Sequence, residues 1–149
     1  MPRLKEMGID VIWLMPINPI GELNRKGTMG SYYAVRDYKK VNPEFGDLNS
    51  FKSLVESTHE LGLKIIIDWV ANHSSPDNVW IEQGKLDWYT LDSLGNIQPT
   101  IGTDWWDVAD LNYDNKEMRK EMIESMKYWV KECDIDGLSL IHISEPTRP

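Results

Sequence analysis

Cysteine, long apolar runs and positive charge are scarce or missing in this sequence. Its single cysteine, Cys133, excludes an internal disulfide and leaves the cellular compartment open. No apolar run approaches the roughly 18 residues that a membrane-spanning helix needs. Lys and Arg number 16 against 24 Asp and Glu, and the net charge of −8 argues against nucleic acid or an anionic membrane as the main partner. We therefore expect a globular protein with neither nucleic acid nor membrane as its partner.

Three stretches of the chain share one pattern, in which a helix end is followed by Gly or Asp and then by an apolar run. They span residues 4–14, 60–67 and 132–137. Gly suits the left-handed position after a helix because it has no Cβ. An apolar run without alternation predicts a parallel strand that helices cover on both faces.

Two amphipathic helices are predicted between these strands. The first runs roughly from Asp47 to Leu61, and one of its faces carries Leu48, Phe51, Leu54, Val55 and Leu61. The second begins with Asp114 as N-cap and Glu117 three residues later, a capping-box pattern. Its apolar stripe, which we assign to packing against a sheet, consists of Met118, Met122, Ile123, Met126, Trp129 and Val130. Alternating strands and helices are typical of crossover units in an α/β protein.

The connections that follow the strands are long, whereas those that precede them have only a few residues. Residues 17–46 follow the first strand and residues 71–113 the second. Long loops after the carboxyl ends of strands are where α/β folds place their active sites. Aromatic side chains in these loops would suit flat apolar ligands such as sugar rings, with loop packing as the alternative. They are Tyr32, Tyr33, Tyr38, Trp80, Trp88, Trp105 and Trp106.

The second strand ends in a polar cluster within the stretch KIIIDWVANHSS, residues 64–75. Asp68, at the exit of an apolar strand, must meet a cation or several donors if it is buried. Asn72 offers a carbonyl oxygen to a hard cation, and His73 can donate to a hydroxyl or accept from one. Taken alone, this pattern also fits a hydrogen-bonded turn. Asp110, further along the chain, would by itself be interpreted as an acidic loop residue or as a residue at a helix start.

Taken together and in order, these motifs resemble glycoside hydrolase family 13, the α-amylase family. The matching stretches are residues 30–38 after the family's second strand, residues 42–46 before the next helix, and residues 110–112 at the end of its small domain. The D-x-x-x-N-H motif that ends the family's third strand is matched within residues 68–73. The resemblance covers residues 3–137.

The resemblance implies an α/β fold, namely an incomplete (β/α)8 TIM barrel with the second to fourth strand units and a small domain inserted after the third strand. Residues 1–73 would be partial barrel and residues 74–113 the inserted domain. Residues 114–137 would be a barrel helix and the start of the fourth strand. Residues 138–149 resemble the translation of a sequencing adapter, so we expect a non-native tail and a frame that ran off the end of a DNA fragment, as in metagenomic sequence.

Site roles also follow from the resemblance. Tyr33 would stack against the sugar next to the cleaved bond, and His73 would hydrogen-bond to its hydroxyls. Asp68 would be a structural carboxylate that orients an arginine of the fourth strand. Asn72 and Asp110 stand where many members bind calcium, although two oxygen ligands are far short of the six to eight that calcium takes. We expect Tyr33, His73 and Asp110 around one cleft, with no cofactor required and calcium as an optional ion.

The residues that break the bond are expected to be absent. The family hydrolyses with retention, using an Asp nucleophile and a Glu acid/base. Counted from Gly137, the arginine is expected two residues later and the nucleophile four residues later. The sequence has Ser139 and Ile141 at these two positions. The Glu belongs to a fifth strand that has no counterpart in this sequence. The chain by itself is therefore expected to be inactive.

The sequence thus predicts a fragment of a retaining α-glucan hydrolase. Its parent would be of the α-amylase, cyclomaltodextrinase or α-glucosidase type and would cleave α-glucosidic bonds in starch-like oligo- or polysaccharides. Three alternatives stay open. They are a transglycosylase acting on the same bond, a non-catalytic carbohydrate-binding relative, and an unrelated α/β barrel.

Overall fold

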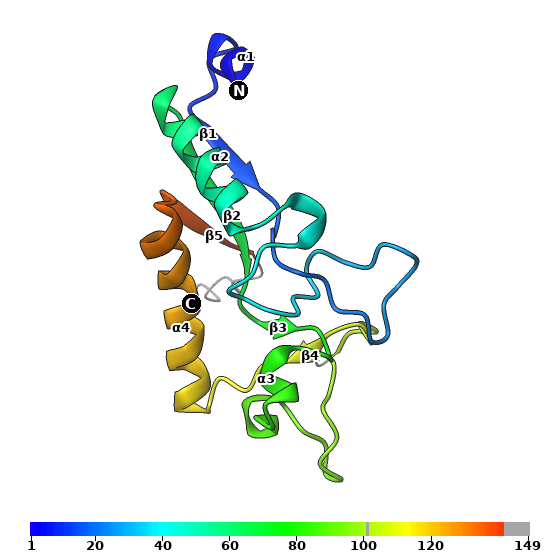
Figure 1. Ribbon diagram of the computed structural model, residues 1–149. Coiled ribbons are helices and arrows are strands. Elements are labelled where there is room, and N and C mark those ends of the chain that lie inside the picture. The colour runs from blue at the N-terminus through cyan, green and yellow to red at the C-terminus, as the bar shows by residue number, and fades with distance from the viewer. Residues whose placement is uncertain (101, 142–149) are drawn as a thin grey trace, which may run out of the picture.

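The computed structural model describes residues 1–100 and 102–141 and has an α/β arrangement around a three-stranded parallel sheet (Figure 1). Strand β2 (Lys64–Val70) lies in the centre and pairs in parallel with β1 (Val11–Leu14) and with β5 (Gly137–Ile141). The predicted parallel sheet is thereby confirmed. Residues 138–141 of the expected tail belong to β5, and the rest of that tail lies outside the described residues.

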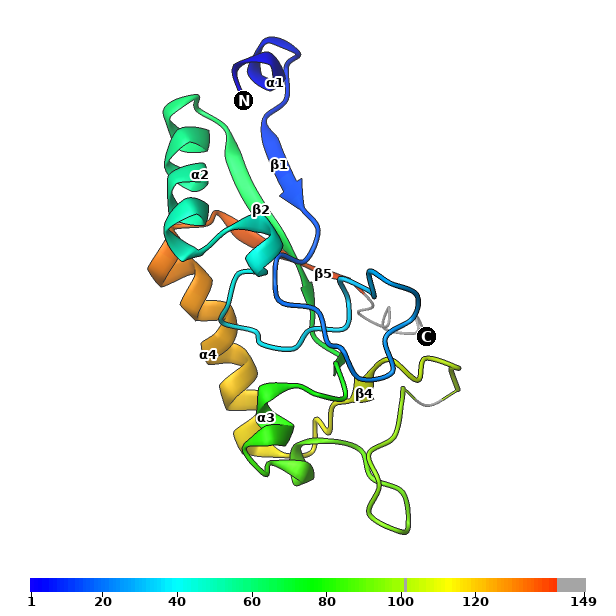
Figure 2. The same cartoon turned by 45° about the vertical axis from the view of Figure 1, so that its right-hand side comes forward.

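Helices α2 (Leu48–Glu60) and α4 (Lys116–Cys133) lie on the same side of this sheet in both views (Figures 1 and 2). The β2 side chains that they cover are Ile65, Ile67 and Trp69, which are at most 1% exposed. Trp69 Nε1 donates to the sulfur of Met122 on α4 at 3.3 Å. Burying apolar area of this kind is the main favourable term in folding. The core therefore lies between this face of the sheet and the two helices, and it extends to Tyr38, Trp80 and Trp88 of the long connections.

The shorter elements lie mostly in the two long connections. Strands β3 (His73–Ser74) and β4 (Ala109–Asp110) pair antiparallel in a second, two-stranded sheet. The remaining elements are the helix α1 (Pro2–Glu6), the 3-10 turn η1 (Pro43–Phe45), the helix α3 (Val79–Glu82) and the 3-10 turn η2 (Leu86–Trp88).

The opposite face of the sheet is open at β1. Val11 is 47% exposed and Trp13 60% exposed, and the two alternate along β1 with more protected neighbours. The prediction of a strand covered on both faces is therefore wrong for β1. The reason is geometric, because both long helices of the described chain pack on the other face. Successive residues of a strand point to opposite faces, so every second side chain of β1 meets solvent.

One helix start is as predicted and the other is not. Asp47 caps α2 and accepts a hydrogen bond from the N–H of Ser50 at 2.8 Å. The cap of α4 is Asn115 rather than Asp114, since its side-chain oxygen accepts from Glu117 N at 3.0 Å and Met118 N at 3.1 Å. The predicted capping box is wrong, because Glu117 stands one position too close to the true cap to complete it.

The buried face of α4 is also rotated from the predicted stripe. Ile123 is 50% exposed and Val130 47% exposed. A small polar residue and the cysteine take part in the buried line instead, which consists of Met118, Met122, Ser125, Trp129 and Cys133. Residues three and four apart share one helical face, and both this line and the predicted stripe obey that spacing. Only contact with the sheet decides between them.

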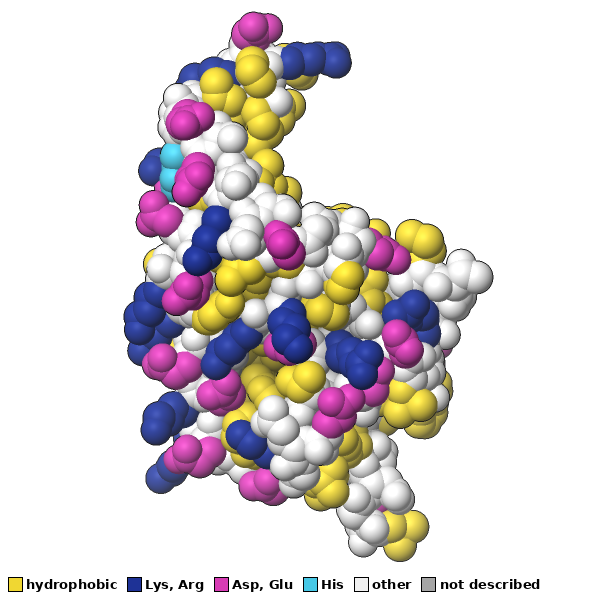
Figure 3. Space-filling view, viewed as in Figure 1, with side chains coloured by type: hydrophobic (Ala, Val, Ile, Leu, Met, Phe, Trp, Pro, Cys, Tyr) yellow, Lys and Arg dark blue, Asp and Glu magenta, His cyan; other side chains and the backbone are white. Residues whose placement is uncertain are grey.

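Surface charges are mixed on the side of the molecule seen in Figure 3. Lys and Arg side chains lie among Asp and Glu side chains there, so the net negative charge is not gathered into one patch on that face. Among the described residues, none of the helices combines the length and the apolar character that a membrane crossing would need.

At the amino end of the sheet, Asp136 ties the start of β2 to the end of α2. Its carboxylate lies 2.7 Å from Lys64 Nζ and 2.8 Å from His59 Nε2, and it accepts from the N–H of Ile65 at 2.9 Å. Burial alone would raise the pKa of Asp136, but the hydrogen bonds from Lys64, Ile65 and His59 outweigh it and lower the pKa to about 2.

This cluster predicts an acid dependence of stability. A carboxyl whose folded pKa is lowered stabilises the fold above its unfolded pKa of about 4, and this stabilisation is lost as the pH falls toward the folded pKa of about 2. Asp136→Asn should remove that part of the acid dependence. It should lower the free energy of unfolding near pH 7 by at most about 1 kcal/mol, because the charged partner Lys64 is largely exposed and solvent screens that ion pair. Urea titrations at pH 7 and pH 3 measure both effects, and an unchanged acid dependence in the variant would contradict the assignment.

Candidate functional site

Strand β2 brings a buried carboxylate to the carboxyl edge of the sheet. Asp68 is 3% exposed and points away from the helices, since its neighbours Ile67 and Trp69 face them. The hydroxyl of Tyr33 donates to Asp68 Oδ2 at 3.2 Å, so the first long loop touches the strand end here. Burial and this hydrogen bond raise the pKa of Tyr33, which keeps its hydroxyl protonated as a donor.

A cavity of about 330 Å³ lies next to this contact. One wall comes from residues 17–46 and the other from residues 71–113, the two long connections. The lining residues are Lys26, Gly30, Ser31, Tyr33, His73, Trp105, Asp107 and Val108. The volume falls in the usual range of small-molecule sites. Aromatic faces combined with a few polar groups suit a polyhydroxylated ring, which offers both an apolar face and hydroxyls.

His73 is held in this cavity by both its backbone and its ring. Its backbone pairs with Asp110 in the β3–β4 ladder. Its ring lies edge-on to Trp105, with centroids 5.9 Å apart and an interplanar angle of 69°. The side-chain nitrogen of Asn72 lies 2.9 Å from Nδ1 of His73. With that amide donating to Nδ1, the ring proton is assigned to Nε2, which makes Nε2 a hydrogen-bond donor.

The three tyrosines of the first loop take three different places. Tyr33 lines the cavity, as described above. Tyr38 is 2% exposed and stacks on Trp80 at 5.0 Å, so loop packing is its role. Its hydroxyl donates to the carbonyl oxygens of Val70 at 3.0 Å and His73 at 2.8 Å, and burial raises its pKa well above the ordinary value. Tyr32 lies against Phe45 at 5.9 Å, outside this cavity.

The tryptophans of the second connection divide in the same way. Trp80 and Trp88 are 5% and 7% exposed and belong to the core. Trp105 lines the cavity, while Trp106 beside it is 65% exposed and does not. Only Trp105 of these four is therefore placed to meet a ligand in the cavity.

The two residues expected as calcium ligands have different surroundings. Asn72 Oδ1 is buried and has no hydrogen-bond partner in the described part of the chain, so it could serve a hard cation. The carboxylate of Asp110 instead accepts from the Thr90 hydroxyl at 2.7 Å, and it is not among the cavity-lining residues. No three His, Cys, Asp or Glu side chains converge as metal ligands within residues 1–100 and 102–141. These residues do not by themselves form a calcium site.

A set of polar contacts that the sequence did not indicate joins the two walls. Lys26 forms an ion pair with Asp107 at 3.2 Å, and the Asp107 side chain is only 9% exposed. Lys26 also donates to the carbonyl of Asp104 at 3.4 Å, and Asn24 donates to that of Trp106 at 3.1 Å. These partners stand about 80 residues apart in the chain. No sequence motif around either partner predicts the contact.

Comparison with the models of known protein families assigns the chain to one of them. The model of the α-amylase catalytic domain matches residues 1–145. The chain belongs to the α-amylase family, glycoside hydrolase family 13. This membership confirms the resemblance found in the sequence and excludes an unrelated α/β barrel. It does not fix which strand units of the family barrel are present or where an inserted domain begins and ends.

Relatives of known structure or activity are similar to most of this chain, but the similarity covers only part of each relative's own chain. The crystal structure of an α-amylase from Lactobacillus plantarum is 45% identical and has a TM-score of 0.86, with 93% of this chain and 32% of that chain covered. An α-amylase of Geobacillus thermoleovorans, solved in complex with acarbose, is 31% identical with a TM-score of 0.74, over 95% of this chain and 32% of that one. A cyclomaltodextrin glucanotransferase of Geobacillus stearothermophilus is 31% identical over 92% of this chain and 23% of its own length.

This α-amylase-family chain therefore spans about a third of these α-amylases and about a quarter of the glucanotransferase. The relatives include both hydrolases and glycosyl transferases, so the family is shown while the particular reaction is not. The residues of the site, rather than the relatives, therefore bear on which part of α-glucan chemistry this chain can perform.

Proposed function

We propose that this chain is the part of an α-glucan hydrolase that binds the sugar, and that the parent cleaves α-glucosidic bonds in starch-like oligo- or polysaccharides with retention. The observation that carries the proposal is the cavity in which Tyr33, His73 and Trp105 meet in a chain of the α-amylase family. The acarbose complex of the Geobacillus thermoleovorans relative supports an oligosaccharide as the ligand.

Each residue has a physical role in this proposal. The Tyr33 ring offers a flat face to the sugar, and the His73 Nε2–H donates to a sugar hydroxyl. Asp68 fixes the Tyr33 hydroxyl by the hydrogen bond of 3.2 Å. In β5 the register partner of Asp68 is Ser139, so this chain offers Asp68 no arginine to orient there. Asn72 and Asp110 remain proposed calcium ligands of the parent, and binding of the sugar needs no calcium.

Two observations favour alternatives within the family. The similarity to a cyclomaltodextrin glucanotransferase supports a transglycosylase, in which a sugar rather than water enters the second step. The Lys26–Asp107 ion pair supports a non-catalytic binding relative, since the carboxylate that lines the cavity is already paired. Ile141 and Ser139 carry no weight for it, because they fall in the expected non-native tail. The cavity serves all three proposals equally, because each requires an α-glucan to be bound.

Binding of acarbose to the 149-residue chain tests the proposal. We expect Tyr33→Ala, His73→Ala and Trp105→Ala each to weaken binding by about tenfold, which corresponds to about 1.4 kcal/mol. The reason is that each change removes a ring or a donor that lines the cavity. Isothermal titration calorimetry measures the dissociation constants.

Trp106→Ala is the matched control, because Trp106 is the neighbour of Trp105 but does not line the cavity. Its affinity for acarbose should equal that of the unmutated chain. An equal loss in Trp105→Ala and Trp106→Ala, or full affinity in Tyr33→Ala, would show that the sugar binds elsewhere.

Hydrolysis by the chain itself is expected to be absent. Among the described residues that line the cavity, Asp107 alone carries a carboxylate, and Lys26 already pairs with it, while Asp68 beside the cavity accepts from Tyr33. Neither belongs to the Asp and Glu pair that retaining glycosidases need, and position 141 is Ile. A reducing-sugar assay on maltooligosaccharides should give the rate of the buffer blank. Measurable release that His73→Ala abolishes would refute this expectation.

A further inference from the structure

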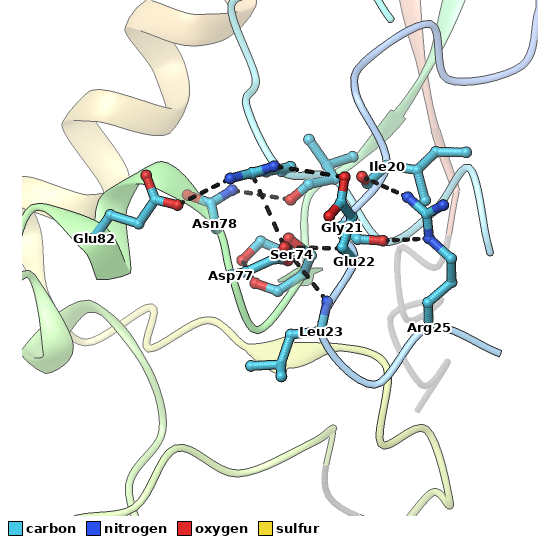
Figure 4. A network of polar contacts seen from close by, with 12 residues as sticks. Ile20, Gly21, Glu22, Leu23, Arg25, Ser74, Asp77, Asn78 and Glu82 are labelled. Atoms are coloured by element: carbon cyan, nitrogen blue, oxygen red, sulfur yellow. Dashed lines mark hydrogen bonds and ion pairs between the residues drawn. The ribbon is translucent and has the colours of Figure 1, made fainter. Parts of the chain in front are cut away.

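The carboxylate of Asp77 lies where three segments of the chain meet (Figure 4). Its Oδ2 accepts from the N–H of Glu22 at 2.8 Å and from that of Leu23 at 3.4 Å. Arg36 Nε lies 3.9 Å from the same oxygen, and Arg36 also reaches Glu82 on α3 at 3.2 Å. Partial burial would raise the pKa of Asp77, but the hydrogen bonds from the Glu22 and Leu23 N–H groups help to lower it below the ordinary value. The group is therefore charged at neutral pH.

Gly21 brings the backbone unusually close to this carboxylate. A Cβ built on Gly21 would lie 2.2 Å from the Cβ of Ser75 and 2.5 Å from Asp77 Oδ1. Neither distance is compatible with a real side chain, so only glycine fits here without a shift of the backbone. The short approach lets the N–H groups after Gly21 point at Asp77.

The segments joined at Asp77 are those that carry the two walls of the cavity. Gly21 N donates to the carbonyl of Ala34, the residue after Tyr33, at 2.9 Å. Ser75 N, two residues after His73, donates to the carbonyl of Val35 at 2.9 Å. A displacement of residues 19–23 would therefore be passed to Tyr33 on one side and to His73 on the other.

We propose that Asp77 is a positioning residue, which holds the loop bearing Tyr33 against the segment bearing His73 through the N–H groups of Glu22 and Leu23 and through Arg36. This inference rests on the proposed binding of a sugar between Tyr33 and His73. Asp77 itself does not line the cavity, so its effect on the ligand is indirect.

Amide hydrogen exchange tests the contact without any sugar. In Asp77→Ala, peptides that cover residues 19–36 should exchange at least about tenfold faster, because two N–H groups lose their acceptor and the loop opens locally. Peptides from β2 should keep their protection. Asp92→Ala is the matched control, since Asp92 accepts from Leu94 N and Asn96 N at 2.8 Å each in another loop. In that variant the faster exchange should stay within residues 92–98.

Unchanged exchange of residues 19–36 in Asp77→Ala would overturn the proposal, and so would an equal loss of protection throughout the chain. Asp77→Asn decides the matter if Asp77→Ala does not fold. The amide oxygen can still accept from Glu22 N, but it carries no charge for Arg36, so a smaller rise of about threefold is expected over residues 19–36. No rise there would overturn the proposal.

A double-mutant cycle connects the contact to the ligand. Asp77→Ala should weaken acarbose binding by about fivefold in the unmutated background and by less than about twofold in Tyr33→Ala, because the ring that it positions is then missing and only the displacement of His73 remains. Additive losses would show that Asp77 acts by another route and would overturn the proposal. If the unmutated chain binds no acarbose, the proposed function fails, and the exchange result still decides the role of Asp77.

Discussion

Two buried carbonyl groups, one at the end of β2 and one at the start of β3, impose the constraint on which this structure depends. Where β2 leaves the sheet, the carbonyls of Val70 and His73 are buried, and a buried carbonyl without a donor is costly. The hydroxyl of Tyr38 donates to both, at 3.0 and 2.8 Å. The first long loop is thereby fixed to the strand end. The rest of the candidate site follows from that attachment.

Fixing the loop at Tyr38 places the residues before it along the edge of the sheet. Tyr33 then reaches the buried Asp68. Val35, which lies between Tyr33 and Tyr38, accepts a hydrogen bond from the N–H of Ser75 in the segment after His73. Lys26 and Asp107 join the far ends of the same two segments. The cavity is thus the space left between two connections that are joined at both ends. Sites assembled from loops on a rigid sheet are common in α/β proteins.

The sequence predicted the elements that depend on local or periodic signals. Unbroken apolar runs predicted the parallel strands, and Asp47 predicted the start of α2. The choice between Asp114 and Asn115 as a cap, and between Ile123 and Ser125 as a buried residue, was decided by contacts with the sheet that a single sequence does not carry. The family motif selected Tyr33 and His73, which do share a cavity. The contacts Lys26–Asp107 and Glu22–Asp77 join residues that are distant in the sequence, and no local sequence pattern predicts them.

The central claim is that an α-glucan binds in the cavity between these two connections. The indole N–H signals of the seven tryptophans offer the most direct measurement, because these residues are spread over the core, the cavity and the surface. In a nitrogen-15 NMR titration of the 149-residue chain with acarbose, the account predicts that the Trp105 signal shifts and that those of Trp13, Trp106 and Trp129 do not. Shifts at Trp13 or Trp106 without one at Trp105, or no shift at saturating acarbose, would contradict it.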